Sequence, residues 1–372
     1  MKTIKRTLVS VLFLAALSAP GQMASAADPD AMSDRLHVGA DPRIELLSAV
    51  QLLSDYKGYK GAQVLTRFDF TYKQEMLEYF GPHKTHRAIR IFSEMSQQGF
   101  WYGQPPETML HLGPPPELEQ RSAFTPFLIE RAGSLENIER FVDALRDFAR
   151  ATDFAAFYDS HRPLYDRLAE SYRARIAGNY IRDIEGYYGT RQASFNVVLA
   201  PIFHCGGFGP RLEREEGLYD VYNLSGPCAV TDDLPDFGSE RNVRRLFWHE
   251  FSHSFVNHLT ERYVDRLMAP CTALMGDRLQ PQHQELQVGE FVSEQVIRAV
   301  TTRLAYLKLG EEAGAEALDF DTTERFHLVG QLLAAFEEYE KSRDLYPTLA
   351  DYYPEVVRIF ERLAEKQVAS LP

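Results

Sequence analysis

The sequence has few cysteines, and it has too few basic residues to balance its acidic ones. Three of the 372 residues are cysteines and no CxxC pair occurs, which disfavours a cysteine-rich zinc site. Lys and Arg number 40 against 53 Asp and Glu, which gives a formal net charge of −13. Such an acidic chain is not expected to bind nucleic acid, nor to bind anionic lipid by simple attraction.

Long apolar runs are also scarce. Residues 8–17 form an apolar run that is about half as long as a transmembrane helix requires, and no comparable run follows it in the sequence. Basic residues precede this run and Ala24-Ser25-Ala26 follows it, a pattern typical of a bacterial signal peptide over residues 1–26. We expect cleavage after Ala26 and a periplasmic or secreted protein without stable membrane insertion.

A location outside the cytoplasm permits a disulfide. We expect Cys205 to pair with Cys228, because the two flank a predicted hairpin, and Cys271 to be left over. The alternative is that all three cysteines are reduced and buried.

Hydrophobic periodicity predicts a mainly helical part over residues 27–192 and a part over residues 193–372 that adds strands. Two segments rich in β-branched and aromatic residues, Phe195–Phe203 and Leu218–Leu224, predict a small sheet. We expect one integrated domain of the α+β class that is predominantly α-helical. Helices are expected near residues 44–53, 71–80, 86–97, 117–131, 135–150, 154–177, 286–307, 323–343 and 354–366. Extended, loop or irregular structure is expected over residues 27–40, 105–116 and 268–281.

His249, Glu250 and His253 form an HExxH motif. On a helix the two imidazoles lie one turn apart and can hold one metal ion, while the glutamate can act on a metal-activated water. Ser239 or Asn242 offers an N-cap, and no Pro or Gly follows before residue 268, so a helix is expected here. The alternative is that the histidines lie on a helix surface or form hydrogen bonds in the core.

Catalytic zinc generally takes three protein ligands. His258 follows His253 by five residues and falls on a different helical face, so we do not expect it to bind. Glu290 and Glu294 lie on a predicted downstream helix, along one stripe with Arg298. The stripe is either a solvated charge ladder or, because the rest of the helix is apolar, a face that lines a cleft.

Several segments resemble a bacterial family of secreted proteins of unknown function, which look like zinc metallopeptidases of the Glu-zincin type. The segments are Gly206–Pro210, Tyr222-Asn223, Trp248–Asn257 and Glu294–Val300, within a similarity that extends from about Ile44 to the C-terminal helices. The resemblance implies a zincin-like architecture with a small sheet beside the HExxH helix, and Glu294 as the third ligand. The chain departs from the family pattern at Arg298, where an acidic or amide residue commonly orients a zinc histidine.

These features predict a zinc-dependent metallopeptidase that binds one zinc ion through His249, His253 and Glu294. Glu250 would be the general base. The expected substrate is a peptide or protein, paired with a candidate edge strand at Phe195–Phe203. Two alternatives are a catalytically silent zinc-bearing protein and a periplasmic binding or scaffold protein without metal.

Other polar residues are candidates by chemistry alone. An oxyanion stabiliser could come from Arg298, Tyr222, Tyr352 or Tyr353. Asn257 either hydrogen-bonds the ligand cluster or caps the helix. His86 and His204 either line a cleft or are ordinary surface or core histidines.

Overall fold

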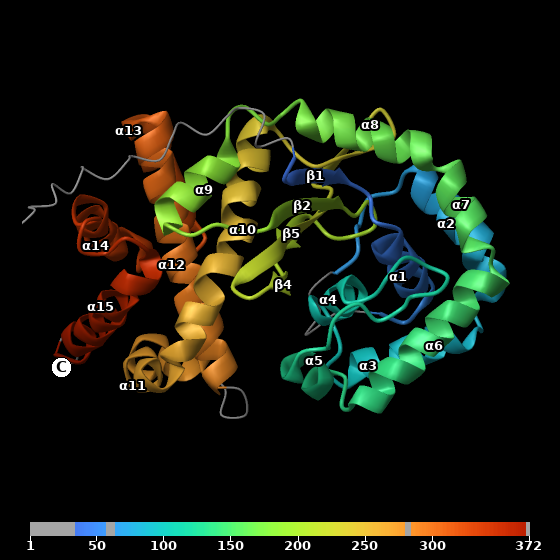
Figure 1. The fold of residues 1–372 in the computed structure, drawn as a ribbon, viewed down its shortest axis with the longest axis horizontal. Helices are drawn as coiled ribbons and strands as arrows, with labels where there is room; N and C mark the ends of the chain where they lie inside the picture. Colours follow the sequence, from blue (N-terminus) through green and yellow to red (C-terminus); the bar gives the residue numbers. More distant parts are fainter. Residues whose placement is uncertain (1–33, 57–63, 280–283, 370–372) are drawn as a thin grey trace, which may run out of the picture.

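The computed structural model describes residues 34–56, 64–279 and 284–369. The predicted signal peptide, residues 1–26, lies outside these ranges. Over the ranges described, none of the helices has the length and apolar character needed to cross a membrane. The fold is of the α+β class and mostly helical, as the sequence predicts (Figure 1).

A mixed five-stranded sheet lies at the centre of the molecule. Two parallel pairings, β1 with β2 and β2 with β5, build its middle, and β3 and β4 run antiparallel to β5 along the outer edge. A separate two-stranded ribbon joins β6 and β7. The strand bounds are β1 Leu36–Gly39, β2 Ser194–Leu199, β3 Gly206–Phe208, β4 Arg211–Glu215, β5 Leu218–Gly226, β6 Ala229–Thr231 and β7 Leu234–Asp236.

The prediction of an edge strand at Phe195–Phe203 is wrong. β2 ends at Leu199 and is hydrogen-bonded on both sides, to β1 and to β5. Its side chains are buried on both faces of the sheet, which is typical of a parallel strand with a nearly continuous apolar run. The strand that covers its other side is β1, within residues predicted to be a disordered or extended lead-in.

Helices cover both faces of the sheet, and each face has its own hydrophobic core (Figure 1). One face is covered by α1 Pro42–Leu53, α2 Thr71–Phe80, α3 Arg87–Gln97, α4 Gln104–Leu110, α5 Pro126–Arg131, α6 Leu135–Ala151 and α7 Phe154–Ser160. On the other side lie α8 Arg162–Arg173, α9 Tyr180–Tyr188, α10 Glu240–Arg262, α11 Val264–Met275, α12 Gln284–Leu309, α13 Glu311–Thr323, α14 Val329–Lys341 and α15 Leu349–Ala369. The last three pack on α11 and α12.

Several predicted helix boundaries differ from the structure, mostly near prolines. The predicted loop at residues 105–116 contains α4, whose first turn accommodates its prolines because no amide hydrogen is needed there. The predicted helix at 154–177 is divided into α7 and α8, and the one at 117–131 shrinks to α5. The stretch at 268–281, predicted to be irregular, is largely α11, which contains Pro270.

The motif helix α10 is fixed at its start and along its inner face. Ser239 caps it by accepting a hydrogen bond from the Asn242 amide at 3.3 Å. Phe247 and Phe251 pack on Phe195 of β2, with ring centroids 6.4 and 5.1 Å away. These contacts hold the middle of α10 on the sheet and leave the histidines on another face of the helix.

The disulfide between Cys205 and Cys228 is present, as predicted, and Cys271 is free and buried. Cys205 immediately precedes β3, and Cys228 lies two residues beyond the end of β5. The bridge therefore fixes the end of the outer edge strand to its neighbour.

Candidate metal centre

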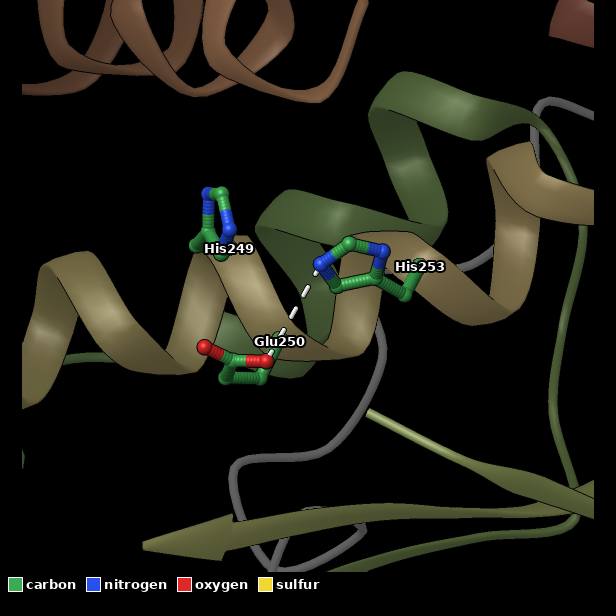
Figure 2. A group of neighbouring side chains, drawn as sticks. All are labelled: His249, Glu250 and His253. Atoms are coloured by element: carbon green, nitrogen blue, oxygen red, sulfur yellow. Dashed lines mark ion pairs between the residues drawn. The ribbon is translucent and has the colours of Figure 1, made fainter. Parts of the chain in front are cut away.

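Three motif side chains gather on one side of α10 (Figure 2). His249, Glu250 and His253 each offer an atom suited to metal binding, and these atoms lie within 4.8 Å of one another. The imidazole rings are nearly perpendicular, at 83°, with centroids 5.1 Å apart. All three side chains are largely shielded from solvent, so the group could hold a metal ion away from bulk water.

Glu294 reaches the same point from α12. Its Oε1 lies 3.6 Å from His249 Nε2 and 3.3 Å from His253 Nε2. Two donors that each lie about 2.1 Å from a tetrahedral zinc ion are about 3.4 Å apart. The two distances from Glu294 therefore fit donors that share a zinc ion, and the structure brings together the predicted ligands and the predicted base, Glu250.

Burial and charge set the ionisation of the two carboxyl groups differently. Burial raises the pKa of Glu250 to about 7; the charge of Glu294 adds to this effect and that of His253 opposes it. Burial also acts to raise the pKa of Glu294, but the two imidazoles and Arg298 hold it well below its usual range. Glu294 is therefore a carboxylate, the form in which a glutamate binds a metal ion.

Asn257 hydrogen-bonds the ligand cluster, which was one of its two predicted roles. Its Oδ1 lies 3.2 Å from His253 Nδ1, so a proton on Nδ1 leaves Nε2 free to face Glu294. His258 lies apart from the cluster, as predicted. Burial, with the charges of Arg211 and Arg262, lowers its pKa to about 4.

Arg298 anchors Glu294 on the side away from the histidines. Its Nε donates to Glu294 Oε2 at 3.2 Å, and its Nη1 donates to Asp321 Oδ1 at 2.8 Å. Thr302 Oγ1 donates to the other oxygen of Asp321 at 3.0 Å. Arg298, which stands where an acidic or amide residue was expected, is thus held by Asp321 of α13, a residue that sequence reasoning missed.

The predicted oxyanion candidates have other structural roles. Arg298 binds Glu294 and Asp321. Tyr352 donates to the Ala335 carbonyl at 2.8 Å, and Tyr353 is fully buried with its hydroxyl on Thr260. Tyr222 belongs to the core on the opposite face of the sheet from α10.

The remaining histidines differ in their surroundings. His86 caps α3, where its Nδ1 accepts a hydrogen bond from the Ala88 amide at 3.2 Å. His204 lies just before β3, with its Nε2 3.4 Å from the hydroxyl of Tyr102. His204 is therefore next to the edge strand that borders the HExxH turn.

The edge strand β3 lies directly against that turn because Gly207 within it and Gly209 just after it have no side chains. A Cβ added to Gly207 would lie 3.0 Å from Glu250 Cγ, and one added to Gly209 would overlap the Glu250 carbonyl oxygen. The glycine-rich segment thus brings the edge of the sheet next to the candidate base.

A cavity of about 350 Å³ opens beside Glu294. Its walls combine apolar and charged side chains from α11, the 3-10 helix after it, α12 and the segment after α13, namely Met275, Arg278, Gln287, Glu290, Phe291 and Phe326. Glu290, the other predicted ligand candidate, lines this cavity one turn before Glu294. Both motif imidazoles form ion pairs with Glu294, and His253 also forms one with Glu250, drawn as a dashed line in Figure 2.

The chain belongs to a family described as Domain of unknown function (DUF4932), whose model matches residues 36–359. The match runs from β1 into α15 and so includes the whole candidate centre. No curated protein and no solved structure matches the chain. The predicted membership of a family of unknown function is confirmed, and the family description names no activity.

Proposed function

We propose that this DUF4932 protein is a zinc-dependent metallopeptidase of zincin-like architecture, acting in the periplasm or outside the cell. The observation that carries the proposal is the convergence of His249 Nε2, His253 Nε2 and Glu294 Oε1. Glu250, the residue next to the first ligand, is the candidate base in the same cluster.

The donor set suits zinc in kind as well as in spacing. Two imidazole nitrogens and one carboxylate oxygen are a common ligand set of catalytic zinc, which keeps a further position open. Bound zinc would supply a Lewis acid and would lower the pKa of water toward about 7.

Glu250 carries the proton transfers. It takes a proton from the attacking water while the water oxygen forms a bond to the peptide carbonyl carbon. It then gives that proton to the amide nitrogen as the C–N bond breaks, so the products are a carboxylic acid and an amine. Glu250 is only 5 % exposed. Because its carboxylate is shielded from solvent, it exchanges this proton with the substrate and not with bulk water.

An extended peptide is the substrate class that the surroundings favour. Among the described strands, β3 pairs only with β5, so its outer side has backbone groups available for an added strand. A peptide paired there would pass over Glu250, which touches Gly207. The cavity beside Glu294 offers room for a substrate side chain.

The test is metal analysis combined with hydrolysis of a mixed peptide library. Protein purified without chelator should contain about one zinc per chain. Glu250→Gln should retain the metal and lose hydrolysis, whereas Glu261→Gln, at the far end of the same helix, should retain both. Cleavage by Glu250→Gln at the parent rate would refute the role of this base. If the parent protein contains zinc but cleaves no peptide, a catalytically silent zinc-bearing protein is favoured. If the parent contains no metal, a scaffold protein is favoured.

A further inference from the structure

Tyr102 has an uncommon backbone conformation that the surrounding structure holds in place. It lies between α3 and α4 with φ at 59°, in the left-handed region that side-chain-bearing residues rarely occupy. Its amide donates to the hydroxyl of Tyr56 at 2.7 Å. The Tyr56 ring in turn packs edge-on against Phe92 of α3, at 5.0 Å. Backbone strain of this kind is often found at functional sites.

The side chain of Tyr102 extends from the N-terminal part of the chain onto the edge strand. Its ring centroid lies 5.3 Å from that of Phe208 in β3 and 5.4 Å from that of His204. Phe208 directly follows Gly207, the residue that touches Glu250. Tyr102 is 38 % exposed, so it is a surface residue of the edge and not part of a closed core.

The negative charges of three nearby glutamates affect the pKa of the Tyr102 hydroxyl. Burial of the hydroxyl raises the pKa of Tyr102 to about 12, with further contributions from Glu250, Glu294 and Glu290 in that order. Two of these residues belong to the candidate centre and the third lines the adjoining cavity. The phenol therefore keeps its proton at neutral pH, and beside β3 it is available as a hydrogen-bond donor.

We propose that Tyr102 donates a hydrogen bond to the oxyanion that develops on the scissile carbonyl, and that the strained backbone of residue 102 fixes this hydroxyl in position. The role rests on the proposed function. Tyr102 would be the oxyanion stabiliser. Tyr222, Tyr352 and Tyr353 are unsuited to that role because each is held elsewhere in the fold. The hydroxyl belongs to a segment that lies far from the HExxH motif in sequence.

His204 is a positioning residue for this donor. When its Nε2 carries the proton, the imidazole donates to the Tyr102 oxygen across 3.4 Å, which leaves the phenolic hydrogen free to point at a substrate. Burial lowers the pKa of His204, which keeps the imidazole neutral. The pair then presents one donor and no net charge to the reacting carbonyl.

The experiment compares Tyr102→Phe with the parent protein, both loaded with Co²⁺. The visible absorption of bound Co²⁺ changes when an anion binds, and inorganic phosphate is the anion that is added. Tyr102→Phe keeps the ring and its packing, and it should bind Co²⁺ with an unchanged spectrum while its phosphate Kd rises about tenfold or more. On the peptide library, kcat should fall about 100-fold with little change in KM. The matched control is Tyr79→Phe, which removes a similarly exposed hydroxyl on α2.

The outcomes separate this inference from the proposed function. One outcome is that the parent cleaves no peptide but Tyr102→Phe still binds phosphate more weakly than the parent does. This would support an anion-stabilising role for the Tyr102 hydroxyl and overturn the peptidase proposal. Unchanged phosphate Kd and kcat in Tyr102→Phe would overturn the role of Tyr102 and leave the peptidase standing. Absence of any phosphate effect on the parent spectrum would also overturn the role of Tyr102. Failure of the parent to bind Co²⁺ would overturn both.

Discussion

Arg298 donates a hydrogen bond to Glu294 Oε2 at 3.2 Å, and the other carboxylate oxygen faces both motif histidines. A glutamate side chain on a helix can adopt several rotamers, and this contact selects one of them. Arg298 is itself held by Asp321 and lies over the Phe326 ring, 3.6 Å from the centroid. The donor geometry at the centre therefore depends on α13 as well as on α10 and α12.

Removing the third donor should weaken metal binding. Glu294→Gln keeps the shape of the side chain but removes its charge, and we expect zinc affinity to fall by at least an order of magnitude. Chelator competition measures the change. Glu290→Gln is the control, because it alters the carboxyl one turn earlier on α12. If Glu290→Gln loses the metal and Glu294→Gln keeps it, Glu290 and not Glu294 is the third ligand.

Removing the arginine anchor should weaken zinc binding without removing a ligand. We expect Arg298→Met to bind zinc about 10- to 100-fold more weakly, because Glu294 loses its fixed orientation. Arg303→Met is the matched control: Arg303 lies on the same helix and is similarly buried, but pairs with Glu337 and Glu340. Both variants should lower the free energy of unfolding. Equal zinc affinity in the two would contradict the anchoring role of Arg298.

Reduction of the disulfide should destabilise the protein. Cys205 and Cys228 are 23 residues apart, and closing a loop of this length lowers the entropy of the unfolded chain by the equivalent of about 3 kcal/mol. Urea unfolding with and without dithiothreitol should show this loss for the parent and for Cys271→Ser. The double variant Cys205→Ser/Cys228→Ser should be insensitive to the reductant. A parent protein that unfolds identically in both conditions would contradict the prediction.

A buried glutamate remote from the metal centre should make stability depend on pH. Glu45 is fully buried and its carboxylate accepts a hydrogen bond from Tyr72. Burial raises the pKa of Glu45 from 4.5 to about 8. Between these values the folded protein binds more protons than the unfolded chain. The free energy of unfolding should therefore fall as pH rises, by at most about 1.4 kcal/mol per pH unit from this group.

Glu45→Gln tests this linkage, because a neutral amide cannot titrate. Urea unfolding at a series of pH values between 5 and 8 should show a shallower decline in Glu45→Gln than in the parent. Glu78→Gln, on the exposed side of α2, should follow the parent. The attribution to Glu45 fails if Glu45→Gln and the parent decline in parallel.

The sequence predicted those parts of the site whose residues lie within one or two turns of each other on the same helix. His249, Glu250 and His253 share a helix, so their spacing alone specifies that they meet. The helix that carries Glu290, Glu294 and Arg298 was also visible as an apolar pattern with a charged stripe. Its approach to α10 is a tertiary contact, and choosing between the two glutamates required the family resemblance.

The remaining parts depend on contacts that leave no local signal. Asp321 is one acidic residue among many, and only the packing of α13 on α12 brings it to Arg298. Tyr102 lies near a Pro-rich stretch without periodicity. The position of β2 in the sheet was mispredicted because the flanking strand β1 has only four residues, too few to show an alternating pattern.

The glycine-rich edge strand has a consequence for how the protein tolerates change. A methyl group at Gly209 would overlap the backbone of Glu250 and one at Gly207 would crowd its side chain, so neither position is expected to tolerate a larger residue. Under the proposed function, changes in peptide selectivity are then expected in neighbouring segments that can vary, those that carry Tyr102 and Glu290. Directed evolution of selectivity should start from libraries in those two segments.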